Sequence, residues 1–168
     1  MEERLKALET AIKLEEDGKE FYIKASEKST QPFSKDMFKS LAEAEDNHIQ
    51  KAKEIYKKLK SDGEWPKLVT SSKDEVEVKS VFPKDLKMTK EELTETTYVL
   101  NIGIEMEEKS IKYYDELAEK AVDPFEKRYY IALSREERGH YLDLSDYKEY
   151  FSDPAGWFGV REGFRLDG

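Results

Sequence analysis

An internal repeat constrains the fold of this chain more than any other feature of its sequence. Each of its two histidines follows a glutamate by three residues, and Glu137 and His140 stand 92 residues after Glu45 and His48. Two unrelated amphipathic helix pairs would share apolar positions, but they would not readily share both histidines and their glutamates. The offset therefore predicts a duplicated helical hairpin. Held without an insertion, it also pairs Glu15 with Glu107, Tyr22 with Tyr114, Pro32 with Pro124 and Leu41 with Leu133.

The hydrophobic pattern predicts where the two hairpins lie. Apolar residues recur at steps of three and four through about 1–61 and again through 89–152, which is the spacing of amphipathic helices. Between them, 62–88 contains turn residues and two prolines, and is long enough to run back along a helix. Its stretch 76–82 partly alternates and could form a short strand. The pattern predicts an all-α fold, a four-helix bundle with one long crossover between helices 2 and 3.

Signals at the helix starts and in the tail complete this prediction. We expect the remaining segment, 153–168, to be irregular, with its aromatic residues Trp157, Phe158 and Phe164 either packed back onto the protein or forming a subunit contact. Proline suits the first turn of a helix, and a capping residue followed three positions later by glutamate forms a capping box. The expected starts are Pro32 for helix 2, Thr89 with Glu92 for helix 3, and Asp123, Pro124 and Glu126 for helix 4.

Composition excludes several classes of function. A net charge of -9 disfavours binding to nucleic acid or to an anionic membrane. The absence of cysteine excludes disulfides, iron–sulfur clusters and thiol nucleophiles within these residues. No run of about twenty apolar residues predicts a transmembrane span, and the start lacks an apolar signal core, so we expect a cytoplasmic protein. Abundant Lys and Glu with few Asn and Gln lean towards a thermophilic source.

Six ionisable side chains are predicted to face one interior. Residues three apart lie on the same helix face, and the neighbours of each Glu-x-x-His pair at helical spacing are apolar. Two further glutamates interrupt the apolar stripes of the first and third helices. Glu16 and Glu108, one helical step of about 100° from these two, should point away. The six are Glu15, Glu45, His48, Glu107, Glu137 and His140.

Burying four carboxylates together requires a positive partner. Unpaired buried carboxylates are too costly to remain ionised, and neighbouring ones raise one another's pKa. No lysine or arginine occupies the stripes near these positions, whereas two divalent cations would balance four carboxylates. Carboxylate and imidazole together suit iron or manganese, and open coordination positions would admit oxygen or peroxide. The alternative is a core whose polar groups merely pair with each other.

The sequence resembles the rubrerythrin branch of the ferritin-like di-iron carboxylate proteins. The resembling phrases are "AIKLEEDGKEFY", "LAEAEDNH", "IGIEMEEKSIKYY" and "LSREERGH". The resemblance implies a ferritin-like bundle over 1–152 that holds two iron ions, with manganese or a mixed pair possible. In this pattern Glu15 and Glu107 would be terminal ligands, Glu45 and Glu137 would bridge the metals, His48 and His140 would each bind one metal, and Tyr22 and Tyr114 would hydrogen-bond to ligand glutamates.

Two departures from the family pattern bear on activity. Rubrerythrins usually carry a further glutamate on the third helix, where this chain has Ser110, and that glutamate is tied to peroxide reduction. Many also end in a rubredoxin domain with four cysteines, so electrons here would come from a separate donor such as a rubredoxin.

Three functions remain as hypotheses. The first is an oxidoreductase that reduces hydrogen peroxide or oxygen, and we favour it. The second is a ferroxidase or iron-handling protein of ferritin type, for which a dimer would be evidence against storage. The third is a non-catalytic, metal-stabilised interaction module. The crossover and the aromatic tail lead us to expect a homodimer.

Overall fold

The computed structural model describes residues 1–67 and 88–163. These residues form helices and contain no strand, so the all-α prediction is confirmed for them. The strand considered at 76–82 lies outside the described residues. The helices are α1 (Glu2–Lys28), α2 (Pro32–Asp62), α3 (Lys90–Lys120), α4 (Pro124–Ser152) and the short α5 (Pro154–Gly163).

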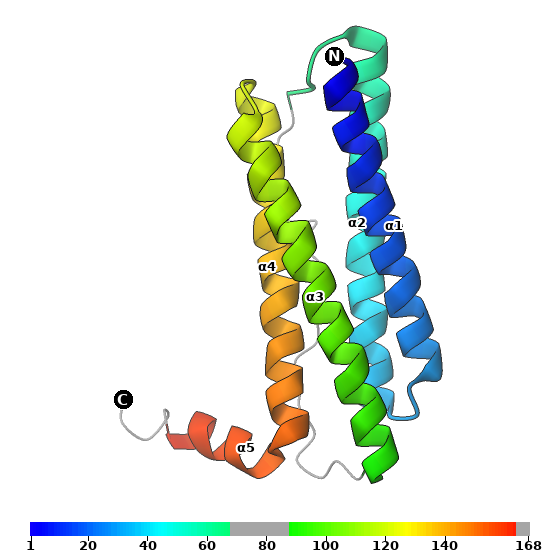
Figure 1. Ribbon diagram of the computed structural model, residues 1–168, viewed down its shortest axis with the longest axis vertical. Helices are drawn as coiled ribbons and strands as arrows, with labels where there is room; N and C mark the ends of the chain where they lie inside the picture. The colour runs from blue at the N-terminus through cyan, green and yellow to red at the C-terminus, as the bar shows by residue number, and fades with distance from the viewer. Residues whose placement is uncertain (68–87, 164–168) are drawn as a thin grey trace.

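The four long helices form two antiparallel hairpins that lie side by side along the same axis (Figure 1). The first hairpin consists of α1 and α2, and the second of α3 and α4. The helix α2 ends at the top of Figure 1, whereas α3 begins at the bottom. This arrangement requires the long connection that the sequence predicted between the second and third helices.

The capping predictions are confirmed at one helix start and half confirmed at another. The hydroxyl of Thr89 accepts a hydrogen bond from the Glu92 amide, and the Glu92 carboxylate accepts one from the Thr89 amide, so the box at α3 is complete. At α4 the Asp123 carboxylate caps two amides, including that of Glu126. The Glu126 carboxylate, however, lies 2.8 Å from Arg4 Nη2 on α1. A charged partner from the other hairpin thus takes the side chain that was expected to close the second box.

The tail corrects one prediction. We expected 153–168 to be irregular, but Pro154–Gly163 forms α5. The Asp153 carboxylate accepts a hydrogen bond from an amide in the first turn, and the Trp157 ring meets the edge of the Tyr150 ring at 5.6 Å between centroids. This cap and aromatic packing hold a helix that its glycines made hard to recognise. Trp157 and Phe158 pack against buried residues of the bundle, which confirms the packed-tail prediction for these two, whereas Phe164 lies outside the described residues.

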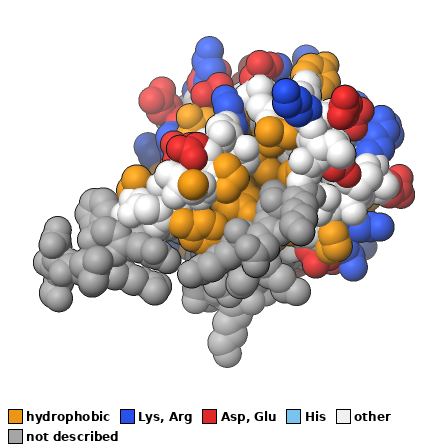
Figure 2. Space-filling model, turned by 90° about the horizontal axis from the view of Figure 1, so that it is seen from below, with side chains coloured by type: hydrophobic (Ala, Val, Ile, Leu, Met, Phe, Trp, Pro, Cys, Tyr) orange, Lys and Arg blue, Asp and Glu red, His pale blue; other side chains and the backbone are white. Residues whose placement is uncertain are grey.

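Two apolar clusters fill the two ends of the interior. Between them, each long helix has a section whose buried side chains belong to neither cluster. The lower cluster, at the end of the bundle that carries α5, contains Tyr22, Phe38, Leu41, Leu100, Leu144 and Tyr147 among others. The upper cluster contains Leu8, Ile55, Leu59, Trp65, Tyr114, Tyr130 and Leu133 among others. Seen from the lower end, hydrophobic side chains also gather at the surface (Figure 2). Among the described helices, none combines the length and apolar character needed to cross a bilayer.

The repeat places Leu41 and Leu133 at matching positions, one in each apolar cluster, and both are almost completely buried. We expect Leu41→Ala and Leu133→Ala each to reduce the free energy of unfolding by about 2–5 kcal/mol, because each leaves a cavity in a packed core. Val122, which is 96% exposed, provides the control, since Val122→Ala should change stability little. Chemical denaturation measures all three variants, and a leucine variant as stable as the control would contradict the described core.

Candidate metal centre

Six buried ionisable side chains lie between the two apolar clusters and form a polar layer across the bundle. One comes from α1, one from α3, and two from each of α2 and α4, and none is more than 6% exposed. They are the six residues that the sequence placed in one interior: Glu15, Glu45, His48, Glu107, Glu137 and His140. Their convergence is therefore confirmed, whereas their binding of a metal stays a prediction.

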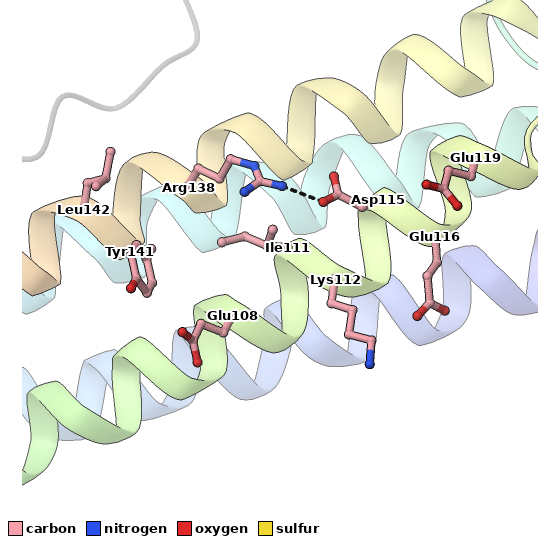
Figure 3. A pocket seen from close by; sticks show the side chains of 9 residues that line it. All are labelled: Glu108, Ile111, Lys112, Asp115, Glu116, Glu119, Arg138, Tyr141 and Leu142. Carbon is pink, nitrogen blue, oxygen red and sulfur yellow. Dashed lines mark hydrogen bonds and ion pairs between the residues drawn. The ribbon is translucent and has the colours of Figure 1, made fainter.

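The neighbouring glutamates point outward, as predicted. Glu16 is exposed and pairs with Lys53 on the surface, 2.7 Å away. Glu108 is also exposed and lines an open groove between α3 and α4 (Figure 3). An ion pair between Arg138 and Asp115 crosses this groove, and no member of the polar layer lines it. Helical periodicity thus separates buried carboxylates from exposed ones that are adjacent in sequence.

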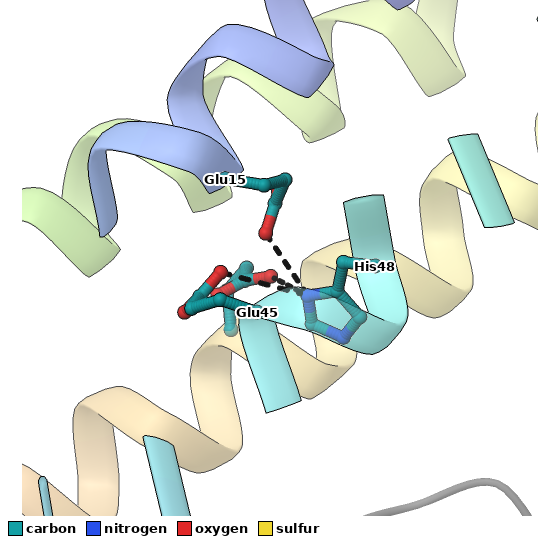
Figure 4. Close-up of side chains that lie close together, drawn as sticks. Glu15, Glu45 and His48 are labelled. Carbon is teal, nitrogen blue, oxygen red and sulfur yellow. Dashed lines mark hydrogen bonds and ion pairs between the residues drawn. The ribbon is translucent and has the colours of Figure 1, made fainter. Parts of the chain in front are cut away.

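His48 faces three carboxylates with one ring nitrogen. Its Nδ1 lies 3.0 Å from Glu15 Oε2, 3.1 Å from Glu137 Oε1 and 3.8 Å from Glu45 Oε2. Figure 4 shows Glu15 and Glu45 next to the His48 ring. These carboxylates come from three different helices, so the imidazole joins both hairpins. The Nδ1 atom of His48 therefore faces the polar layer.

His140 repeats this arrangement on the other side. Its Nδ1 lies 3.3 Å from Glu137 Oε2 and 3.7 Å from Glu45 Oε1. The two imidazole rings are stacked with their centroids 5.9 Å apart. Glu45 and Glu137 therefore each direct one carboxylate oxygen towards His48 and the other towards His140. This is the placement that a carboxylate needs to connect two neighbouring metal ions.

Two tyrosines brace the layer from opposite hairpins. The Tyr22 hydroxyl on α1 donates a hydrogen bond to Glu107 Oε1 on α3. The Tyr114 hydroxyl on α3 donates to Glu15 Oε1 on α1. Burial, together with the adjacent carboxylates, raises the pKa of both phenols, so each remains a donor. The hydrogen bonds that the family resemblance implied for these tyrosines are thus present, and each one joins the two hairpins.

The pKa shifts of the layer residues show that four ionised carboxylates are unfavourable there without a cation. Burial and the charges of Glu137 and Glu15 raise the pKa of Glu45, and burial and Glu137 raise the pKa of Glu107. Burial acts against the charged form of His48, but the surrounding carboxylates outweigh it and raise the His48 pKa. Burial also acts against the charged form of Glu137 and by itself would raise its pKa, but His48 and His140 lower that pKa. Without a metal, the layer must retain protons to compensate its charge.

The donor atoms fit two divalent cations. Two overlapping groups each bring four ligand atoms within 4.8 Å of one another: Glu15, Glu45, His48 and Glu137 in one, and Glu45, Glu107, Glu137 and His140 in the other. Both groups contain Glu45 and Glu137. The buried Glu137 Oε1 also lacks a hydrogen bond of good geometry, as a metal ligand would. A set of four carboxylates and two imidazoles suits iron or manganese.

Sequence reasoning missed one residue of this site. Glu136 comes from α4, and its Oε2 lies 2.7 Å from His48 Nε2, on the side of the ring away from the layer. Burial alone would raise the pKa of Glu136, but the hydrogen bond to His48 and its charge lower that pKa. Glu136 lies outside the apolar stripe and contacts a histidine of another helix, so the periodicity of α4 gave no sign of this contact.

A model of a known protein family matches this chain. The family model of rubrerythrin matches residues 6–148, which include most or all of each long helix and the whole polar layer. No curated protein and no solved structure matches the chain.

The pKa shifts predict how the stability of the metal-free chain depends on pH. Glu45, Glu107 and His48 have raised pKa values, so above the ordinary values of 4.5 and 6.5 the folded chain binds more protons than the unfolded chain. Stability must then fall as pH rises. The lowered pKa of Glu137 affects stability only below about pH 4.5, the ordinary value for glutamate. We expect the melting temperature of the metal-free protein to fall between about pH 5.5 and pH 9.

The control for this prediction is Glu45→Gln, which removes one of the titrating groups and should make the fall smaller. Thermal unfolding followed by circular dichroism in the presence of a chelator measures both proteins. A melting temperature that stays constant or rises across this range would contradict the described charge balance.

Proposed function

The chain belongs to the rubrerythrin family, and from this premise we propose that it is a di-iron carboxylate oxidoreductase that reduces hydrogen peroxide or oxygen. The observation that carries the proposal is the pair Glu45 and Glu137, each of which directs one oxygen to each histidine. A core that merely paired its own polar groups would not need such a shared position between two equivalent nitrogen donors.

The six side chains take separate roles in this proposal. Glu45 and Glu137 would be shared between two ions, and His48 and His140 would each hold one ion through Nδ1. Glu15 and Glu107 would be terminal ligands, and Tyr114 and Tyr22 hold one oxygen of each by a hydrogen bond. Because Tyr114 binds Glu15 Oε1, it leaves Oε2 facing the His48 side of the layer. The phenols thus fix the direction in which each terminal carboxylate offers its free oxygen.

The chemistry requires electrons, protons and a dry site. Iron bound here would cycle between its ferrous and ferric states and supply two electrons that, with two protons, convert hydrogen peroxide into two water molecules. The apolar clusters above and below the layer exclude bulk water from the carboxylates. The raised pKa of Tyr22 and Tyr114 keeps their hydroxyls protonated, so they remain hydrogen-bond donors to the ligand glutamates.

The proposal includes partners. The 168 residues contain no cysteine, so they cannot hold a rubredoxin-type iron, and we propose that a separate donor such as a rubredoxin supplies the electrons. We also propose that the chain acts as a homodimer. Ser110 stands where the family usually has a further glutamate, and Gly18 occupies the equivalent position in the first half, so neither half has a carboxylate there and the site would be more symmetric.

The experiment uses protein loaded with ferrous iron without oxygen, then mixed with hydrogen peroxide or oxygen in the presence of a reduced donor. We expect repeated turnover, with one peroxide consumed for every two electrons. Glu107→Gln should lower the rate at least about tenfold, because it replaces an anionic ligand by a neutral one. Glu108→Gln makes the same chemical change at the exposed neighbour and should behave as the wild type.

Two results would contradict the proposal. One is peroxide consumption no faster than that of free ferrous iron. The other is oxidation of many iron ions per chain without turnover of the donor, which would indicate a ferroxidase instead.

A further inference from the structure

The outer nitrogen of His48 has a carboxylate partner supplied by the opposite hairpin. Glu136 Oε2 lies 2.7 Å from His48 Nε2, while His48 Nδ1 faces the polar layer. The side chain of Glu136 is 27% exposed, so it lies at the edge of the core between the buried imidazole and solvent. The imidazole is therefore held from both sides, by the layer carboxylates at Nδ1 and by Glu136 at Nε2.

The other half of the repeat lacks this partner. The residue that corresponds to Glu136 in the first hairpin is Ala44, which is buried and cannot accept a hydrogen bond. Among the described residues, none hydrogen-bonds to His140 Nε2. Asp143 lies one turn further along α4, where the charge of His140 acts against the effect of burial on the Asp143 pKa, but no described hydrogen bond joins the two side chains. The duplication is thus symmetric in its six layer residues and asymmetric in the carboxylate behind the histidines.

A carboxylate behind a histidine ligand has a defined effect. It accepts the hydrogen bond from Nε2–H, so the lone pair that binds a metal is left on Nδ1, and it makes that nitrogen a stronger donor. It also fixes the orientation of the ring. Loss of such a partner commonly lowers metal affinity by about 10–100-fold.

We infer that Glu136 is a positioning residue that makes the two metal positions unequal, so that the ion beside His48 is bound more tightly than the ion beside His140. The inference rests on the proposed two-metal centre. It assigns the difference to one hydrogen bond rather than to the ligands themselves, which are equivalent in the two halves. Partial loading of the protein would then fill the His48 position first.

The test is a titration of the metal-free full chain with Mn²⁺, in which the electron paramagnetic resonance signal of the free ion reports each binding step. We expect the wild type to bind in two distinguishable steps. Glu136→Ala should weaken the tighter step by about 10–100-fold and leave the weaker one unchanged. Glu136→Gln keeps a neutral acceptor, so its Mn²⁺ affinity in the tighter step should lie between those of the wild type and Glu136→Ala. Glu108→Gln, the exposed control, should match the wild type.

A second readout follows the hydrogen bond itself. In the Zn²⁺-loaded protein, nuclear magnetic resonance of ¹⁵N-labelled histidine should show one Nε2–H proton that exchanges slowly with solvent and one that exchanges fast. Glu136→Ala should make both fast. A variant that only perturbed folding would not remove the protection of one histidine while leaving the other unchanged.

The outcomes separate the two claims. If the wild type binds two ions and Glu136→Ala binds them with the same two constants, the inference is overturned and the metal centre stands. Equal weakening of both steps would also overturn it, because Glu136 would then act on the whole layer. If the wild type binds no Mn²⁺ or Zn²⁺, the metal centre fails and the inference fails with it.

Discussion

Burial of four carboxylates in the middle of a bundle is the constraint on which the rest of this structure depends. Such groups must be protonated, paired or bound to cations, since an isolated buried charge is too costly to keep. The layer contains two imidazoles to compensate them, and it lies between two apolar clusters whose Tyr22 and Tyr114 donate hydrogen bonds to it but supply no positive charge. The same clusters make the bundle stable enough to hold this layer. Fold and site therefore depend on one another, because each long helix contributes side chains both to the apolar clusters and to the polar layer.

The duplicated hairpin provides the means to build such a layer. Each hairpin contributes half of the ligands, and each tyrosine brace comes from one hairpin and binds a glutamate of the other. A site between two copies of the same unit acquires equivalent halves without further adjustment. Differences arise where the copies have diverged. Tyr22 stacks on Phe38, whereas Tyr114 stacks on Tyr130, and Glu136 has Ala44 as its counterpart. Departures from the repeat thus show where the two halves can differ in chemistry.

The sequence was sufficient to predict the four long helices, the buried face and the convergence of the six ionisable residues. Helical periodicity carries that information, because residues three apart such as Glu45 and His48 must share a face. It could not predict contacts that depend on how the helices are placed against one another. Glu136 meets His48 across helices, and Arg4 takes the Glu126 carboxylate that was expected to close a capping box. The helix α5 was missed because its stability comes from a cap and from aromatic packing rather than from propensity.

The central claim is that two metal ions lie in the polar layer and share Glu45 and Glu137. The most direct measurement is a crystal structure of the iron-loaded protein with anomalous diffraction recorded on both sides of the iron absorption edge. The account predicts two anomalous peaks, one beside His48 Nδ1 and one beside His140 Nδ1, with both shared carboxylates between them. A fully loaded crystal with no peak in the layer, or with iron only at the surface, would contradict it.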